Sequence, residues 1–481
     1  MTKKSTLSEH ILKKGKFITP LNYQFGDVLQ ENPWFKTRLP EYIWLGLIIN
    51  HYGREEGLKK CNRILKVLYK KQNLIEIPKL SIILGLTQGD QDNLYKNFKG
   101  IIDSQVLSPL TLIFTYSKFP VFASYFYSTL SLEERLNRID DVMEKTSDQQ
   151  SELSTDIKFL ILAHQINIGK LYTTQETAEL FSKYPLCSHK DEIMRLIRPN
   201  IRACEVSLPN DYNSNYLDTF WEGLSRMNKC KLSYIEYTDN HNDSEKYVKT
   251  IKEKLLYYTN MFSSTRPLDN RMLVIIGTAT YAYKRMLEVV EHSLYHSIAG
   301  RSVVRVMIES YIILKYLLLK ESEHSDIWTE YQYYGIGQYK LIAERFRELG
   351  VDLPESHVEY NYIDFLVSEY KNKEFIDMDT SYFDKINVRE KAKAIGEKQL
   401  FGLYYDYDSA FEHGLWGAIR ESSLLKCNEV SHQYHCVPDV DNEQRMKDVW
   451  NDCKMAMDKI MSIIQDLYGL PDSFSEEASD E

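Results

Sequence analysis

Apolar residues recur every three or four positions along most of this chain, which is the spacing that puts side chains on one face of an α-helix. In the first half, Pro40 fits the first turn of one such helix. The same pattern predicts helices over residues 55–71, 131–145, 155–168, 188–206 and 216–227. In the second half it predicts helices over residues 243–262, 271–297, 299–320, 328–349, 360–372, 389–425 and 442–467. The chain is therefore expected to be all-α.

The polar run from Thr238 to Lys246 has the composition of an exposed linker, and we place a domain boundary there. Residues 1–240 are expected to form a helical domain that serves as a sensor, a platform or an oligomerisation module. Residues 241–470 are expected to form a helical bundle that carries the candidate site. The acidic residues 471–481 are expected to be a disordered tail.

Composition narrows the class of protein. The 20 glycines and 13 prolines are few for 481 residues, which favours long helices over a turn-rich β-fold. The formal net charge of −10 argues against a general nucleic-acid coat, although a local basic patch stays open. The 7 cysteines include no CxxC pair and no secretory leader precedes them, which is typical of reduced thiols in a cytoplasmic protein. No apolar run is long enough for a membrane span, and no nucleotide-binding or HExxH motif occurs, so neither membrane association nor a cofactor is expected.

Two segments of the second half carry chemically capable side chains at helical spacing. In the first, Arg305 and Glu309 lie one helical turn apart in a run that is apolar on most sides. In the second, Ser409 and His413 have the same spacing, with Tyr407 close by. Each pair is expected to share one face of its helix, in or beside the core of the bundle.

Two interpretations of this cluster stay open. Buried charges have to be paired, so the side chains can form a structural network that fixes the register of two helices. Alternatively, they form an active site. His413 would then be the acid or base, and Arg305 would stabilise phosphate charge. Glu309 would orient the arginine, and Ser409 or Tyr407 would bind phosphate.

The run from Ala299 to Glu309, together with the later Tyr404…Ser409-x3-His413 pattern, resembles an uncharacterised bacterial helical family. The resemblance extends over about residues 284–425. That family pairs an Arg-x3-Glu helix with a Tyr/Ser-x3-His helix and is similar to HEPN-type bundles. Many HEPN proteins are ribonucleases of toxin–antitoxin, CRISPR and abortive-infection systems, and others only bind nucleotides or partners. The resemblance therefore implies a HEPN-like bundle in a protein of phage defence.

The HEPN ribonuclease signature is an arginine followed by a histidine after four to six residues. Arg285 and His292 have this spacing and would share a helix face, which makes them secondary candidates. Arg301, at the start of the next helix, is a third. Met286 stands where the signature usually has a polar residue.

A cluster of soft ligands lies near the end of the second motif. Cys427, His432, His435 and Cys436 fall within ten residues and are of the types that hold zinc tetrahedrally. Their spacing matches no standard zinc module, and the adjacent His435 and Cys436 chelate awkwardly. We therefore expect no metal here and keep the four residues as the alternative.

The sequence supports two functions of different classes. The first is a bacterial defence effector, a metal-independent HEPN-like ribonuclease or nucleotide-acting protein whose partner is RNA or a nucleotide. The alternative is a non-enzymatic helical scaffold that holds a protein partner or a second copy of itself. In that case the Arg/Glu/Ser/His network is structural.

Overall fold

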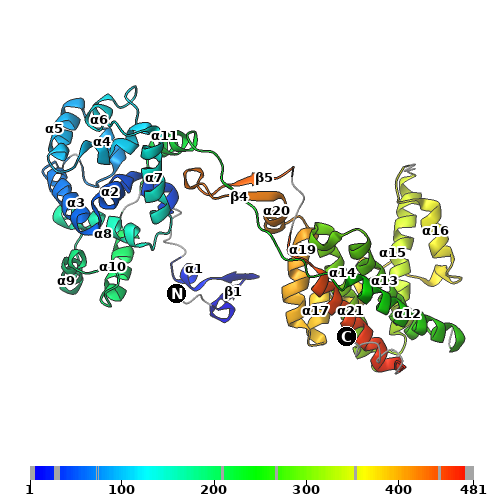
Figure 1. Ribbon diagram of the computed structural model, residues 1–481. Coiled ribbons are helices and arrows are strands. Elements are labelled where there is room, and N and C mark those ends of the chain that lie inside the picture. The colour runs from blue at the N-terminus through cyan, green and yellow to red at the C-terminus, as the bar shows by residue number, and fades with distance from the viewer. Residues whose placement is uncertain are drawn as a thin grey trace. The chain divides into compact units, whose positions relative to one another are not determined.

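A computed structural model of the chain describes residues 6–25, 33–71, 73, 75–206, 208, 211–265, 269–350, 355–441 and 446–471. Helices dominate these residues, and the strands among them are short (Figure 1). The all-α class predicted from the hydrophobic pattern is therefore confirmed. The predicted acidic tail lies, apart from its first residue, outside the described residues. None of the described helices combines the length and the apolar character that a membrane span requires.

The chain forms two compact units, and each of them consists of two separate segments of the sequence. Unit 1 contains residues 1–233 and 426–435, and unit 2 contains residues 234–425 and 436–481. The division after residue 233 lies close to the boundary that we placed at the polar run. The return of residues 426–435 to unit 1 has no counterpart in the hydrophobic pattern.

Unit 1 is a helical domain with two small strand pairs. It begins with β1 (Ile11–Lys13) and β2 (Lys16–Ile18), which pair antiparallel. Its helices are α1 (Pro20–Phe25), α2 (Leu39–Tyr52), α3 (Arg54–Tyr69), α4 (Leu80–Leu84), α5 (Gln88–Lys99), α6 (Pro120–Tyr125), α7 (Leu132–Thr146), α8 (Glu152–Asn167), α9 (Gln175–Lys183), α10 (Met194–Val206) and α11 (Ser214–Ser225). After α11, β3 (Leu232–Ser233) pairs antiparallel with the end of β4 (Leu424–Cys427).

The core of unit 1 forms around α2, which packs against α3, α7 and α8. Every residue of α2 from Leu39 to Ile49 is buried, because this stretch is apolar almost all round. The charges that enter the core are paired, as burial requires. Arg38 Nη1 lies 2.5 Å from Glu205 Oε2, and both residues are buried.

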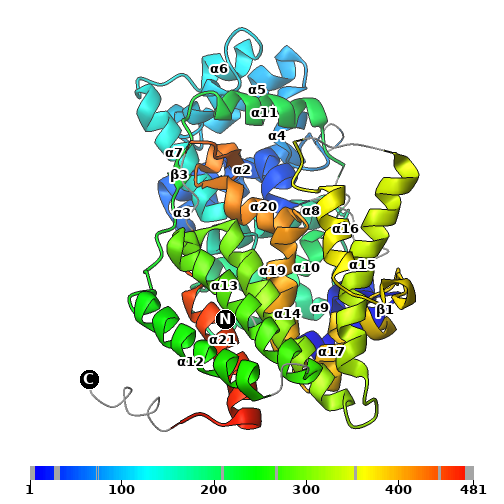
Figure 2. The ribbon, with the colours of Figure 1, turned by 90° about the vertical axis from the view of Figure 1, so that its right-hand side faces the viewer.

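Unit 2 is a bundle around one central helix. Its elements are α12 (Ser244–Thr265), α13 (Asn270–Glu291), α14 (Ile298–Lys320), α15 (Ile327–Leu349), α16 (Tyr360–Ser368), α17 (Val388–Ala394), α18 (Lys398–Leu400), a π-helical turn at Phe401–Tyr405, α19 (Asp406–Glu412), α20 (Trp416–Ser423), β5 (Cys436–Pro438) and α21 (Trp450–Tyr468). The central α14 packs against α13, α17, α19 and α21 (Figure 1). α15 and α16 lie side by side (Figure 2).

The single helix predicted over residues 389–425 is wrong. The structure divides this stretch into α17, α18, the π-helical turn, α19 and α20. Glycines cause two of the breaks. Gly396 and Gly414 have φ angles of 79° and 55°, and such left-handed residues end helices.

The loop between α16 and α17 is held against α15, and this contact brings Tyr382 to the candidate site. Lys340 Nζ donates to the carbonyl of Ile376 at 2.8 Å. A Cβ on Gly337 would lie only 2.4 Å from the carbonyl oxygen of Asp377, so the loop approaches the helix where no side chain intervenes. The absence of a side chain at Gly337 therefore sets the position of this loop.

Two glycines of α15, the buried Gly337 and the exposed Gly335, give a matched test. Gly337→Ala is expected to lower the free energy of unfolding of unit 2 by about 1–3 kcal/mol, because the backbone at Asp377 has to move. Gly335→Ala places its Cβ in open space and is expected to raise it by up to about 1 kcal/mol, because alanine favours helix. Urea unfolding of the full chain, followed by circular dichroism, measures both. Equal stability of the two variants would contradict the close approach.

Candidate functional site

A polar network in unit 2 is centred on α14. Arg305 donates from Nε to Ser409 Oγ at 3.0 Å and from Nη2 to the hydroxyl of Tyr405 at 2.7 Å. Its Nη1 lies 3.6 Å from Glu309 Oε2, one turn along the same helix. The structure thus brings together three of the predicted site residues, Arg305, Glu309 and Ser409.

Two tyrosines that we did not predict complete this network. Tyr382 donates to Glu309 Oε1 at 2.6 Å, and Tyr405 donates to Glu309 Oε2 at 3.2 Å. The guanidinium of Arg305 also lies over the Tyr405 ring, 4.6 Å from its centroid. Both charged side chains of the pair are only about a fifth exposed, 21% for Arg305 and 23% for Glu309. The pair therefore lies at the edge of the core, with every charged group in contact with partners.

The local backbone explains why Tyr405 and Ser409 act together. Tyr405 is the last residue of the π-helical turn, and Ser409 lies one turn later in α19. The spacing rule that singled out Ser409 and His413 applies equally to Tyr405 and Ser409, so this tyrosine had a signal in the sequence. Tyr382 had no such signal in the sequence. It lies in a loop whose position depends on contacts with α15.

His413 lies outside the network. It is the residue after α19, and the helix ends there because Gly414 takes a left-handed conformation with φ 55°. Its side chain is exposed, whereas Ser409 faces Arg305. Tyr407 also points elsewhere and donates to both carboxylate oxygens of Glu421 at 2.7 Å. The structure does not bring His413 or Tyr407 to Arg305.

Arg301 belongs to a second charged cluster at the start of α14. It is buried and donates from Nη2 to the carbonyl of Lys447 at 2.7 Å. The guanidinium lies 5.8 Å from the ring centroid of Tyr407. Burial raises the pKa of the nearby Asp408 to about 7, while the charge of Arg301 opposes that rise and Asp452 adds to it.

Arg285 and His292, the pair with the HEPN-like spacing, also have separate surroundings. Arg285 Nη1 lies 2.5 Å from Glu288 Oε2, in an ordinary ion pair within α13. His292 follows the last residue of α13 and is exposed. In the described part of the chain, no hydrogen bond joins these two side chains. Their geometry is that of a solvated helix surface.

A cavity of about 460 Å³ opens beside Glu309. It is lined by Gly277, Thr278, Tyr281, Val306, Glu309, Ser310, Ile313, Tyr331 and Tyr382. Burial is the main cause that raises the pKa of Tyr331 to about 12 and that of Tyr382 further still, and the negative charge of Glu309 adds to the rise. Both phenols therefore keep their protons at neutral pH, and the carboxylate of Glu309 is the charged group of the wall.

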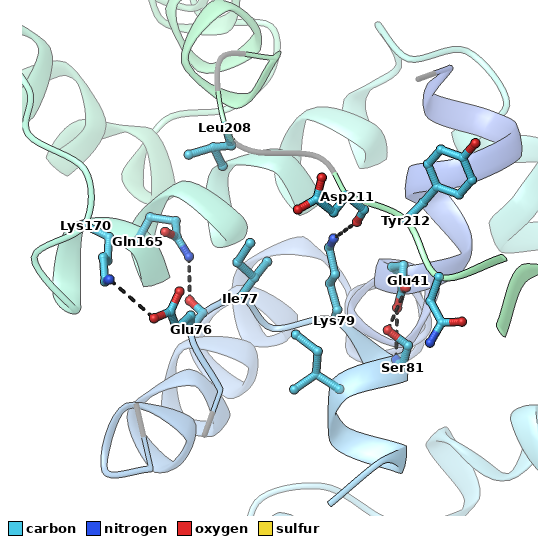
Figure 3. Close-up of a pocket in the computed structure, with 12 residues that line it drawn as sticks. Glu41, Glu76, Ile77, Lys79, Ser81, Gln165, Lys170, Leu208, Asp211 and Tyr212 are labelled. Atoms are coloured by element: carbon cyan, nitrogen blue, oxygen red, sulfur yellow. Dashed lines mark hydrogen bonds and ion pairs between the residues drawn. The ribbon is translucent and has the colours of Figure 1, made fainter. Parts of the chain in front are cut away.

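Unit 1 has a cavity of its own, of about 570 Å³ (Figure 3). The carboxylate of Glu41 accepts hydrogen bonds from the backbone and the hydroxyl of Ser81, at 2.9 and 2.7 Å. Lys79 donates to the carbonyl of Asp211. Burial raises the pKa of Glu41 and lowers that of Lys79. Segments far apart in sequence build this cavity, so no local motif could reveal it.

The soft ligands form a tighter group than the sequence indicated, and with a different membership. Cys427, His432 and His435 lie with Cys230, and the ligand atoms of these four are all within 4.8 Å of one another. The neighbouring Cys436 is exposed and stands outside this group. Cys230 was missed because it lies about 200 residues earlier in the chain.

Residues 273–432 match the model of a family of unknown function, DUF5677. The match covers about a third of the chain, from α13 to the segment that re-enters unit 1, and includes every candidate arginine and histidine of unit 2 named above. It agrees with the expectation of an uncharacterised family and assigns no activity. Neither the curated proteins nor the solved structures contain a match to this chain.

The structure predicts a clear difference between the effects of substituting Arg305, inside the network, and His413, outside it. Arg305→Met is expected to lower the free energy of unfolding of unit 2 by about 1–3 kcal/mol, because Glu309 loses its counter-charge and Ser409 and Tyr405 lose a hydrogen-bond partner. His413→Ala is expected to change it by less than about 0.5 kcal/mol, because the imidazole is exposed. Urea unfolding measures both values, and a large loss in His413→Ala would contradict the placement of this residue.

Asp408 predicts a dependence of stability on pH. Its pKa is raised to about 7 in the folded chain from an ordinary value of 3.8, so the folded state binds the proton more tightly than the unfolded state. The stability that this group contributes is therefore lost as pH rises from about 4 to about 7, at about 1.4 kcal/mol per pH unit. Asp408→Asn should flatten this part of the profile, measured by urea unfolding across that range. Asp406→Asn, at an exposed position, is the control and should leave the profile unchanged.

Proposed function

We propose that unit 2 is a binding module that takes a small organic cation in the cavity beside Glu309, and that the Arg305 network is structural. The observation that carries this proposal is the wall of the cavity. It combines one carboxylate with three tyrosines, Tyr281, Tyr331 and Tyr382. A carboxylate and aromatic faces are the groups that hold an ammonium or guanidinium head.

The size of the cavity supports a small molecule. Its volume of about 460 Å³ falls in the range of pockets that enclose compact ligands. Apart from Glu309 and the tyrosines, its wall contains Thr278 and Ser310, which offer hydroxyls, and Val306 and Ile313, which offer apolar surface. Such a wall suits a cationic head attached to a short polar or apolar chain.

The network gives Glu309 a fixed orientation. Tyr382 and Tyr405 donate to its two oxygens, and Arg305 is held beside it by Ser409. Each carboxylate oxygen can accept more than one hydrogen bond, so Glu309 retains capacity for a ligand. Arg305 partly neutralises the negative charge of Glu309, which favours weak, reversible binding of a cation over tight binding.

The competing hypothesis, a HEPN-like ribonuclease of bacterial phage defence, rests on the resemblance of the motifs. It needs a histidine within reach of the arginine that stabilises phosphate charge. His413 and His292 are both exposed residues that follow helix ends, and Arg305 is engaged by other partners. The free thiols support the expected cytoplasmic location for either function.

The proposal is tested by filling the cavity. The Cβ of Gly277 would meet open space, so Gly277→Met is expected to fold normally and to occupy the cavity. With choline and agmatine as probes, saturation-transfer NMR on the full chain should detect binding to the wild type. Gly277→Met and Glu309→Gln should weaken it by about tenfold or more, which corresponds to about 1.4 kcal/mol.

Gly335→Ala is the control for this experiment and should bind as the wild type does, because Gly335 is not part of the cavity wall. Absence of binding of either cation to the wild type, or equal binding by the Gly277→Met variant, would contradict the proposal. Cleavage of single-stranded RNA that is lost in His413→Ala would instead support the ribonuclease.

A further inference from the structure

We propose that Cys230, Cys427, His432 and His435 form a structural Zn²⁺ site in unit 1. The site ties residues 426–435, where the chain re-enters unit 1, to the segment that follows α11. This is a ligand set of two thiolates and two imidazoles drawn from positions about 200 residues apart.

The distances between ligand atoms are those of a tetrahedral zinc centre. Cys230 Sγ lies 3.4 Å from His432 Nδ1 and 3.3 Å from His435 Nε2. Cys427 Sγ lies 3.6 Å from His432 Nδ1. Zinc bonds of about 2.3 Å to sulfur and 2.0–2.1 Å to nitrogen, at tetrahedral angles, separate a sulfur from a nitrogen by about 3.5 Å. These three sulfur–nitrogen distances therefore match those around one tetrahedral ion, and all four ligand atoms lie within 4.8 Å of one another.

The second nitrogen of His432 fixes which tautomer is present. His432 Nε2 lies 3.0 Å from the carbonyl oxygen of Ser225 and 3.2 Å from that of Asn228. Two acceptors around one ring nitrogen require that this nitrogen carries the proton. Nδ1 then turns its lone pair toward the two sulfur atoms. A backbone carbonyl that orients a ligand histidine in this way is the usual second layer of a zinc site.

The backbone shapes the ligand loop before any ion binds. Gln433 and Tyr434 both have left-handed φ angles, 55° and 52°, which reverses the chain between His432 and His435. The turn is closed by a hydrogen bond from the amide of Cys427 to the carbonyl of His435, at 2.9 Å. Tyr434 packs against Phe35, with ring centroids 5.6 Å apart. The loop is thus anchored to the core of unit 1 independently of its ligands.

The thiolate of Cys427 receives further support. The amide of Glu429 donates to its Sγ at 3.4 Å, as backbone amides do to metal-bound sulfur. Glu429 is itself buried and paired with Lys231, whose Nζ lies 2.7 Å from the carboxylate. Lys231 thus neutralises a buried carboxylate beside the cluster.

A second group of four possible ligands in this chain shows what distinguishes the site. Asp239, His241, His296 and Asp448 also lie close together, in unit 2. There, His296 bonds with one ring nitrogen to the carbonyl of Met446 at 2.7 Å and with the other to Asp239 at 2.8 Å. His241 Nδ1 likewise lies 2.7 Å from Asp448 Oδ2. That group is therefore a set of histidine–carboxylate pairs, whereas the cysteine group contains no carboxylate and offers two sulfur ligands, which favour Zn²⁺.

The ligand types select the metal and its role. Two thiolates and two imidazoles in a tetrahedral arrangement favour Zn²⁺ over magnesium or calcium. Four protein ligands leave no open position, so the site is structural. Its effect is to close a chain loop of about 200 residues, the kind of long loop whose closure by a crosslink restricts the unfolded chain most.

The test uses the full chain, purified under reducing conditions, and measures bound metal by inductively coupled plasma mass spectrometry. We expect about one Zn²⁺ per chain. Exchange for Co²⁺ should give the visible absorption of a tetrahedral ion together with a thiolate-to-metal band. Cys230→Ser and His435→Ala, both at exposed positions, should lose the metal while the circular dichroism spectrum keeps its helical signal.

Cys436→Ser is the matched control, because Cys436 is exposed and adjacent to His435 but outside the group. It should retain the metal. The proposal is overturned if the wild type neither contains zinc nor binds Co²⁺ tetrahedrally, or if Cys436→Ser loses the metal and Cys230→Ser retains it. A disulfide between Cys230 and Cys427 in a second sample purified without reductant, detected by mass spectrometry, would overturn it equally.

Discussion

Unit 2 depends on how it accommodates a pair of charges on its central helix. α14 is apolar on most sides, yet it carries Arg305 and Glu309 where it meets α19. A charge left unpaired there would cost several kcal/mol, so partners have to come from elsewhere in the bundle. Two of these partners come from one short stretch of the chain. Tyr405, the last residue of the π-helical turn, and Ser409, one turn later in α19, both reach the guanidinium.

The same requirement connects the network to the cavity. Glu309 needs hydrogen-bond donors. One of them, Tyr382, lies in the loop that contacts α15. Lys391 also stabilises that loop, because it is fully buried and donates to the carbonyls of Phe383 and Ile386. Tyr382 therefore stabilises the ion pair and also forms part of the cavity wall. A ligand that contacted Tyr382 would alter the surroundings of Glu309 directly, which couples the occupancy of the cavity to the stability of the bundle.

Local patterns predicted what depends on neighbours in sequence. The all-α class, the helix predicted over residues 131–145 and the pairing of Arg305 with Glu309 all follow from spacing rules. His413 shows the limit of such rules. It stands at the spacing that would place it with Ser409, but the glycine after it ends the helix and redirects its side chain. A glycine directly after a candidate residue indicates that the helix ends there, and this indication outweighs periodicity in the last turn of a helix.

What sequence patterns could not predict are the contacts between segments distant in the chain. The sequence showed Cys427, His432, His435 and Cys436 as a possible metal set, which was disfavoured because the adjacent His435 and Cys436 chelate awkwardly. In the structure Cys230, which precedes the whole of unit 2, takes the place of Cys436 in this group. The chain leaves unit 1 after residue 233 and returns for ten residues before it leaves again. Val430, which is buried, and Tyr434 pack this short segment against the core of unit 1. The proposed zinc ion would add a crosslink made by four side chains, one of which comes from the other end of the excursion.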